Sequence, residues 1–276
     1  MIENIIILAG GASSRMKNSV DQNLSKEKVA QANKLSKGLI ELNGKPFISY
    51  LLENILKVEF KNVYIITGEN SQMFRQALEN NPNFRDLNIK FAIQHIPKGR
   101  YKPYGTADAL HQCLVQFPKL REDTFCVCNS DNLYSLNALM NLKKSNSRQA
   151  ILAYDIDKLN YTKERIARFA VMKFDHDYNL TTIVEKPEPD QIANFKDTHQ
   201  KIRVSMNIFL FDGRLFFKYL ESCPAHPTRD EKELPTALMN MIEDNIKVKG
   251  IPIAEHVPDL TSKNDISILE NYLSEN

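Results

Sequence analysis

The sequence lacks the two commonest phosphate-loop signatures, which narrows the possible nucleotide-binding classes. It contains neither G-x-G-x-x-G nor G-x-x-x-x-G-K-[ST], so neither a dinucleotide-binding fold nor a P-loop is supported. It also lacks charge imbalance: 36 basic residues stand against 34 acidic ones. The bulk charge therefore indicates no nucleic-acid partner and no membrane partner, and any recognition of a polyanion must be local.

Two further absences bear on compartment and metal content. The four cysteines, Cys113, Cys126, Cys128 and Cys223, lack the C-x-x-C spacing of a zinc site, and we expect them to be reduced core residues. No apolar run approaches the length of a membrane span, and the N-terminal run is too short for a signal peptide. We therefore expect a cytoplasmic protein.

Strand-like apolar runs alternate with helical patterns in the first half of the chain. We expect strands at 5–9, 63–67, 89–93 and 124–128, and helices at 47–56, 71–78 and 107–117. This alternation predicts right-handed βαβ units and a mostly parallel sheet, with ligands at the carboxyl ends of the strands.

The second half is richer in β-branched and aromatic residues, which predicts antiparallel additions to the sheet. We expect strands at 150–155, 167–174, 180–185 and 204–211, followed by helices at 231–243 and 265–273. No linker or internal repeat interrupts the chain, so we expect a single domain over residues 1–276. The polar stretch 18–35 lengthens a connection that is normally short. It is either an inserted helix or mobile lid, or a solvated insertion without a role.

The first strand runs into a loop of small residues that ends on two cations, Arg15 and Lys17. Gly10 and Gly11 allow close approach of the backbone, and free N–H groups after a strand form an anion-binding concavity. Arg15 adds a fork of donors that fits phosphate oxygens. The loop is therefore a candidate phosphate site, with an ordinary βα turn as the alternative.

Other candidates follow at expected strand or helix ends. Asp131 follows a central strand, a natural magnesium position, although a turn or N-cap is the alternative. Gly105 and Thr106 open a helix whose donors can face a phosphate or ribose. Gln94 ends a strand with an amide that both donates and accepts, as reading a base edge requires. Residues 98–104 carry three cations, either a triphosphate-facing flap or a solvated loop.

Two more motifs lie late in the chain. Glu185-Lys186-Pro187 ends a strand, where Glu185 can accept hydrogen bonds from vicinal hydroxyls and Lys186 can contact a phosphate. Asp259 precedes a helix, which taken alone indicates only an N-cap.

Together these motifs resemble the sugar-1-phosphate nucleotidylyltransferases, and the resemblance runs from about residue 3 to residue 273. The motifs that carry it, in order, are Gly10-Gly11-x-x-x-Arg15-Met16, Ser36-Lys37-Gly38-Leu39-Ile40 before Gly44-Lys45-Pro46, Gly105-Thr106-Ala107, Asp131-Asn132-Leu133-Tyr134, Glu185-Lys186-Pro187 and Asp259. The resemblance implies a Rossmann-like three-layer α/β/α fold of the nucleotide-diphospho-sugar transferases, with a mixed, mostly parallel sheet. It also implies transfer from an NTP to a sugar 1-phosphate, with Mg²⁺ as cofactor, NDP-sugar and pyrophosphate as products, and often a homo-oligomer.

The resemblance further assigns roles to residues. Arg15 would hold the β- and γ-phosphates, Lys37 the α-phosphate and the sugar phosphate, and Asp131 and Asp259 the metal. The implied nucleoside-binding residues are Leu8, Ala9, Gly10, Gly11, Gln94, Gly105 and Thr106. The implied sugar-phosphate residues are Glu185, Lys186 and Asn207. Lys37 lies 22 positions after Arg15 (37 minus 15), a longer interval than is usual in the family, because residues 18–35 intervene. Ser205-Met206-Asn207 and Phe169-Ala170 also depart from the common Asn-Ala-Gly and Tyr-Gly.

Three alternatives stay open. The first loop also resembles cytidylyltransferases and molybdopterin guanylyltransferases, which act on other phosphates, whereas Glu185-Lys186-Pro187 and Asp259 favour a sugar phosphate. A glycosyltransferase of similar fold would use Asp131 but would not need Arg15 or Lys37. A non-enzymatic nucleotide sensor is the third alternative, although the charged residues that the chemistry requires are all present.

Overall fold

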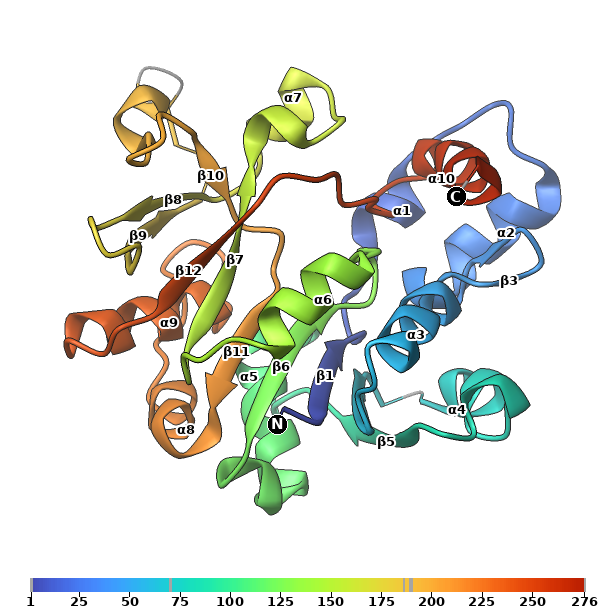
Figure 1. Ribbon diagram of the computed structural model, residues 1–276. Coiled ribbons are helices and arrows are strands. Elements are labelled where there is room, and N and C mark those ends of the chain that lie inside the picture. Colours follow the sequence, from blue (N-terminus) through green and yellow to red (C-terminus); the bar gives the residue numbers. More distant parts are fainter. Residues whose placement is uncertain (1, 70, 186, 189–190, 276) are drawn as a thin grey trace.

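The structure, a computed structural model, describes residues 2–69, 71–185, 187–188 and 191–275 (Figure 1). Lys186, one of the predicted sugar-phosphate residues, lies outside this described part. The description below applies to these ranges only.

Four parallel strands form the first half of the central sheet, in the spatial order β5-β4-β1-β6. Their bounds are β1 Asn4–Leu8, β4 Asn62–Thr67, β5 Asn88–Ile93 and β6 Thr124–Asn129. Leu8 at the end of β1 pairs with Ile66 of β4 on one side and with Asn129 of β6 on the other. The carboxyl ends of these strands therefore lie at one edge of the sheet, where ligands of such sheets bind.

The second half of the sheet is mainly antiparallel and continues in the order β11-β7-β10-β8-β9. The bounds are β7 Ala150–Asp155, β8 Val171–Phe174, β9 Leu180–Val184, β10 Arg203–Val204 and β11 Phe209–Asp212. A last strand, β12 Lys249–Ile253, pairs parallel to β7. A separate hairpin joins β2 Glu41–Leu42 to β3 Lys45–Pro46.

Helices cover both faces of the sheet, as Figure 1 shows. Their bounds are α1 Ser14–Asn18, α2 Lys26–Lys34, α3 Phe47–Lys57, α4 Gln72–Leu78, α5 Thr106–Gln116, α6 Leu136–Lys143, α7 Lys163–Ile166, α8 Gly213–Glu221, α9 Leu234–Glu243 and α10 Asn264–Glu275. Short 3₁₀ turns lie at Lys37–Leu39, Pro82–Phe84, Pro118–Arg121, Ile156–Lys158 and Ile192–Phe195.

The side chains of β1 alternate between two cores. Ile5 and Ile7 pack on the face covered by α3, α6 and α10, whereas Ile6 packs on the face covered by α5, α8 and α9. All three are fully buried, because a central parallel strand with helices on both faces exposes neither side. This arrangement confirms the predicted three-layer α/β/α class.

The expected strands of the first half are all present, whereas two expected strands of the second half are wrong in detail. The strand expected at 167–174 begins only at Val171, because α7 precedes it. The strand expected at 204–211 is broken into β10 and β11, since Asn207 adopts a left-handed conformation with φ 55°. This conformation cannot continue a strand, and Asn tolerates it better than most residues.

The sequence analysis did not expect α1, α6, α7, α8, the β2–β3 hairpin or β12. Helix α8 begins where the Asp212 side chain accepts a hydrogen bond from the Arg214 N–H, 3.0 Å away. Strand β12 contains Gly250 and Pro252, which are both unfavourable inside strands. Gly250 is required by packing, because a Cβ there would lie 2.3 Å from the Phe174 ring.

The stretch 18–35 contains α2, which is tied to the C-terminal helix α10. The Lys28 Nζ lies 2.7 Å from a carboxylate oxygen of Glu270, and Ala32 is fully buried. Leu24 and Leu35 also pack against the core. Figure 1 shows α2 and α10 on the same side of the molecule. A role as a lid stays a prediction.

All four cysteines are buried and unpaired, as expected, and burial raises the pKa of the Cys126 thiol. Among the described residues, no helix combines the length and the apolar character needed to cross a membrane.

Gly213 provides a test of the packing beneath α8. A Cβ there would lie 2.1 Å from the Leu120 carbonyl oxygen, so we expect Gly213→Ala to lower the free energy of unfolding by about 2 kcal/mol or more. The measurement is urea denaturation. Gly68→Ala is the matched control, because a Cβ there meets no heavy atom within 4 Å. Equal midpoints for the two variants would contradict the close contact.

Candidate active site

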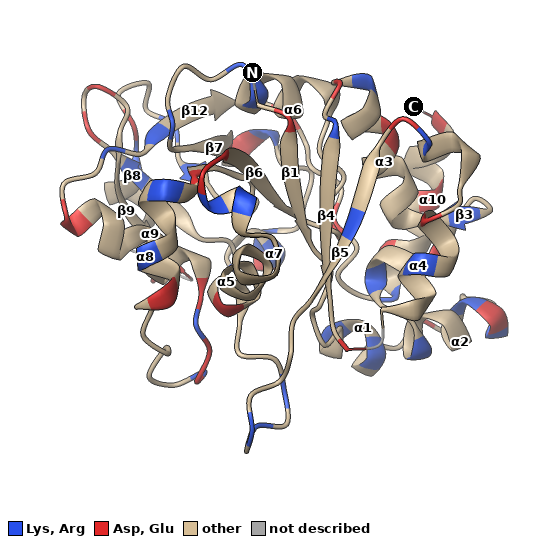
Figure 2. Cartoon of the chain, turned by 90° about the horizontal axis from the view of Figure 1, so that it is seen from below, with Lys and Arg blue, Asp and Glu red and all other residues tan. Residues whose placement is uncertain are grey.

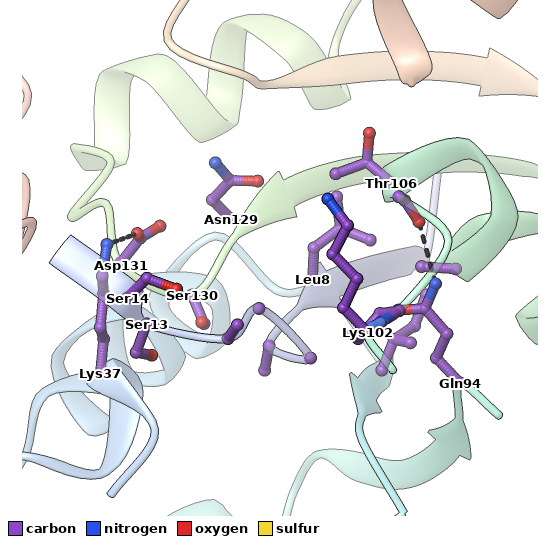
Figure 3. A pocket seen from close by; sticks show the side chains of 18 of the residues that line it. Leu8, Ser13, Ser14, Lys37, Gln94, Lys102, Thr106, Asn129, Ser130 and Asp131 are labelled. Atoms are coloured by element: carbon purple, nitrogen blue, oxygen red, sulfur yellow. Dashed lines mark hydrogen bonds and ion pairs between the residues drawn. The ribbon is translucent and has the colours of Figure 1, made fainter. Parts of the chain in front are cut away.

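A hollow of about 390 Å³ lies at the carboxyl edge of β1, β4 and β6 (Figure 3). It brings together ten of the residues singled out in the sequence: Leu8, Ala9, Gly10, Gly11, Arg15, Lys37, Gln94, Gly105, Thr106 and Asp131. The sequence analysis did not assign the other residues that line it, which are Ala12, Ser13, Ser14, Ile66, Lys102, Pro103, Ala109, Asn129, Ser130 and Glu231. Most of these flank a predicted residue in the chain, so extending each motif by a few positions finds them.

The loop after β1 has a backbone conformation suited to anions. Ser13 is left-handed, with φ 56° and ψ 29°, and the right-handed helix α1 starts at Ser14. Such a left–right pair turns successive N–H groups toward one point, forming an anion-binding nest. The first N–H bonded within this turn is that of Lys17, to the Ser13 carbonyl at 3.0 Å. The N–H groups of Ser14 and Arg15 precede it and are free of intrahelical partners.

Lys37 and Asp131 form an ion pair at one end of the hollow, with 2.8 Å between Nζ and Oδ2 (Figure 3). Lys37 starts the 3₁₀ turn Lys37–Leu39, and Asp131 follows β6. Their side chains are 12% and 24% exposed, so both groups remain accessible to a ligand. The turn packs beside the loop after β6, since a Cβ on Gly38 would lie in ordinary van der Waals contact, 3.5 Å from the Ser130 Cβ.

Asp259 lies beside this pair without lining the hollow itself. Its segment pairs with Asn132 in an isolated antiparallel bridge, and its carboxylate accepts hydrogen bonds from Arg165 and the Thr261 hydroxyl, both at 2.8 Å. Burial and the nearby Asp131 carboxylate raise the pKa of Asp259, while Arg165 opposes that shift. The two carboxylates are therefore close enough to interact electrostatically.

Gln94 lies at the opposite end of the hollow and is 3% exposed. Its Nε2 donates to the Gly105 carbonyl at 2.9 Å and to Asp108 Oδ2 at 2.8 Å. Both partners are acceptors, so they fix the orientation of the amide. In this arrangement both donors of the amide go to protein acceptors and Oε1 is the atom left for a ligand, so the reading of a base by Gln94 stays a prediction. A Cβ on Gly10 would lie 3.4 Å from that oxygen.

The N-terminus of α5 is less open than expected. The Ala107 N–H donates to the Lys232 carbonyl at 2.9 Å, and the Thr106 hydroxyl accepts from the Leu234 N–H at 3.0 Å. Gly105 has φ 99°, and a Cβ there would lie 2.3 Å from the Lys232 oxygen. The glycine is thus required by backbone packing, and the helix donates at Ala107 to the protein rather than to a ligand.

The described members of the predicted sugar-phosphate group do not line this hollow. Glu185 forms an ion pair with Arg229, whose guanidinium also lies 2.6 Å from Glu233. Asn207 is exposed in its left-handed conformation after Ser205, whose hydroxyl accepts from the Asn207 N–H at 3.2 Å. The sequence analysis missed Arg229, because nothing in its local pattern announces a contact with a residue 44 positions away.

The basic loop at 98–104 is tied to an acidic segment of the chain. The Arg100 guanidinium lies 2.7 Å from Asp230 and stacks on the Tyr104 ring, and Lys102 lies 2.8 Å from Glu231. This connection between β5 and α5 projects from the body of the molecule (Figure 2). Lys102 lies at the Gln94 end of the hollow (Figure 3), away from the Lys37–Asp131 pair. The loop is therefore tied down by ion pairs rather than freely solvated, and a triphosphate-facing role stays a prediction.

Lys263 joins the loop and helix after β1 to the segment that carries Asp259. Its side chain is almost fully buried, and its Nζ donates to three carbonyl oxygens around the end of α1, those of Met16, Lys17 and Ser19, at 2.7–2.9 Å. Terminal helix carbonyls have no intrahelical partner, and the ammonium satisfies them. The position of α1 relative to Asp259 is set by this contact.

Comparison with known proteins agrees with this architecture. The family model described as nucleotidyl transferase matches residues 4–251. A glucose-1-phosphate adenylyltransferase of Hydrogenovibrio crunogenus is 24% identical over 97% of this chain and 60% of its own length. Glucose-1-phosphate adenylyltransferase 1 of Vibrio parahaemolyticus is 26% identical over 78% of this chain and 50% of its own length. The chain thus spans 50–60% of the length of these curated relatives.

A solved structure, that of UDP-glucose pyrophosphorylase complexed with UDP-glucose, matches over the whole of both chains with a TM-score of 0.72 and 14% identity. At this identity the likeness concerns the fold. Fold and site together define an α/β protein with a charged hollow at the carboxyl edge of its parallel strands. The family match is more specific: the chain belongs to the nucleotidyl transferase family, which confirms the resemblance seen in the sequence.

The Lys263 contact predicts a loss of stability on its removal. We expect Lys263→Met to lower the free energy of unfolding by about 2–4 kcal/mol, because three buried carbonyls lose their donor. Denaturant unfolding measures this change. Lys34→Met, at an exposed position, is the control and should shift the value by no more than about 0.5 kcal/mol. Similar losses in both variants would show that the three hydrogen bonds of the Lys263 ammonium contribute nothing to stability.

Proposed function

We propose that this chain transfers a nucleotidyl group from an NTP to a sugar 1-phosphate and releases pyrophosphate. The observation that carries the proposal is the polarity of the hollow. A fixed amide acceptor lies at one end, and the Lys37–Asp131 pair lies at the other. A base with an N–H donor suits the first end, and phosphates suit the second. The relatives reported above are glucose-1-phosphate adenylyltransferases, which supports a sugar phosphate as the acceptor.

In the proposed reaction an oxygen of the sugar 1-phosphate attacks the α-phosphorus of the NTP. The bond from that phosphorus to the bridging oxygen breaks, and its electron pair leaves with pyrophosphate. Transfers of this kind depend on in-line positioning and on charge neutralisation rather than on covalent catalysis. Lys37 would neutralise the α-phosphate. Arg15 and the free N–H groups after Ser13 would hold the β- and γ-phosphates.

The remaining roles concern the nucleoside and the acceptor. We assign the nucleoside to Leu8, Ala9, Gly10, Gly11, Gln94, Gly105 and Thr106, which line one continuous hollow. We assign the sugar phosphate to Glu185, Lys186 and Asn207, and add Arg229 because it pairs with Glu185. A homo-oligomer and a cytoplasmic location stay separate predictions.

A divalent metal ion is in general use among nucleotidyl transferases of this family, and we propose Mg²⁺. The residues present fit it, because Asp131 and Asp259 provide hard oxygen ligands on segments joined by the bridge at Asn132. Among the described residues no three or more His, Cys, Asp or Glu side chains form a metal-holding group, so phosphate oxygens and water would complete the ligand shell. When bound, the ion would supply positive charge at the reacting phosphates.

The proposal is tested by a pyrophosphate-release assay with Mg²⁺. The assay combines ATP, GTP, CTP, UTP and dTTP with a panel of sugar 1-phosphates and, in a second arm, with non-sugar phosphate acceptors. Turnover with a sugar 1-phosphate is the expected result. Turnover only in the second arm would favour a cytidylyl- or guanylyltransferase-like activity, and silence in both arms would refute nucleotidylyl transfer.

The metal assignment predicts that Asp131→Asn lowers kcat by about 10²-fold or more while the fold is kept, because a neutral amide is a poor ligand for a hard cation. Steady-state kinetics over a Mg²⁺ titration measure the loss, and thermal unfolding checks the fold. Asp86→Asn, at an exposed position away from the hollow, should behave as wild type. Full activity in Asp131→Asn would remove Asp131 from the metal site.

The role of Lys37 predicts a different kinetic signature. Lys37→Ala should lower kcat by about 10²-fold with little change in NTP affinity, because the charge that Lys37 meets grows in the transition state. Single-turnover rates and equilibrium NTP binding separate the two quantities, with exposed Lys34→Ala as the control. A loss confined to NTP affinity would assign Lys37 to ground-state binding instead.

A further inference from the structure

A second hollow, of about 500 Å³, lies on the other side of Arg15 from the nucleotide hollow. Its walls include Arg15 from α1, Arg165 at the C-terminal end of α7, Arg168 just after that helix, and the hydroxyl residues Thr261 and Ser262 before α10. Arg15 is thus shared, since it also lines the nucleotide hollow. The functional assignments above leave this second hollow without an occupant.

The guanidinium groups of this hollow are not equivalent. Arg165 is engaged by ion pairs with Asp259, at 2.8 Å, and with Asp265. Arg15 and Arg168 are exposed, and neither side chain has a hydrogen bond or ion pair with any other residue that the structure describes. The acidic lining residue is Glu164. Two guanidiniums without described partners therefore border the same space, and both are free to donate to an anion placed there.

The helix that carries Arg15, α1, is held in place by Lys263. Lys263 holds the carbonyls at the end of α1, and the Lys263 N–H donates to the Ser19 hydroxyl at 2.9 Å. Ser19 and Ser262 also line the second hollow. The wall that carries Arg15 and the wall that carries Thr261 and Ser262 are therefore joined directly. Arg168, just after α7, lines the same hollow.

We propose that this hollow is the exit site for pyrophosphate. The inference rests on the proposed function, which makes pyrophosphate the leaving product. After the bond to the α-phosphorus has broken, Arg15 retains one phosphate while Arg168 takes the other, and the product moves from the nucleotide hollow into the second one. Guanidinium forks suit this task, because each offers paired donors to phosphate oxygens. Arg165 stays with Asp259 and Asp265 throughout.

The test compares wild type with Arg168→Ala. We expect the substitution to weaken pyrophosphate binding about 10-fold in isothermal titration calorimetry with pyrophosphate and Mg²⁺. In the reverse reaction it should raise KM for pyrophosphate by a similar factor, while KM for the NTP in the forward reaction changes less than about twofold. Arg85→Ala, an exposed arginine far from the hollow, is the matched control. Because Arg168 has no described side-chain partner, its removal should leave thermal unfolding unchanged.

The two readouts separate this proposal from the proposed function. Calorimetry needs no turnover, so weaker pyrophosphate binding by Arg168→Ala supports the site even where every acceptor panel is silent. Unchanged affinity and unchanged KM for pyrophosphate would overturn it. A third arm adds orthophosphate to wild type. If orthophosphate alters kcat without competing with pyrophosphate, the hollow is regulatory and the exit proposal is wrong.

Discussion

The site depends on two backbone hydrogen bonds between segments 128 positions apart (259 minus 131). The Leu133 N–H donates to the Pro258 carbonyl, and the Leu260 N–H donates to the Asp131 carbonyl, both at 2.8 Å. They bring the carboxylates of Asp131 and Asp259 together against their mutual repulsion. Each carboxylate has its own cation, Lys37 for Asp131 and Arg165 for Asp259. Two carboxylates and two cations thus meet at one point, and each of the four charged groups has a partner of opposite charge.

The same segment also anchors the loop and helix that follow β1. Lys263 follows Asp259 by four positions and holds the carbonyls at the end of α1, so Arg15 and Asp259 are positioned by one short stretch of chain. The insertion at 18–35 starts at this anchor, which includes Ser19, and a second contact, the Lys28–Glu270 ion pair, holds it further along. A long connection is therefore accommodated between two fixed points, which explains how Lys37 reaches Asp131 despite its wide spacing from Arg15.

The sequence patterns predicted those features that depend on neighbouring residues along the chain. The strands β1, β4 and β6 are mostly buried apolar runs, and β5 is the partly exposed edge strand beside β4. The residues after the ends of these strands converge because parallel strands share a carboxyl edge. Contacts between distant segments were beyond reach: Glu185 with Arg229, and the Lys232 carbonyl over α5. The strand β12 was missed because it contains Gly250 and Pro252, which are both unfavourable in strands, and Gly250 is required by its packing against Phe174. The roles of the site residues and the single-domain organisation stay predictions.

Gln94 illustrates why a residue type does not settle a function. As a free amide it can donate and accept, but here Asp108 and the Gly105 carbonyl take its donors, and Gln112 holds Asp108 in turn at 2.9 Å. What the hollow offers at this end is therefore one oriented oxygen, fixed before any ligand arrives. The opposite end offers cations and free N–H groups, which are also fixed beforehand. A ligand with a hydrogen-bond donor at one end and negative charge at the other satisfies both ends in a single orientation. Under the proposed function, these preorganised protein groups would therefore define the direction in which a nucleotide lies.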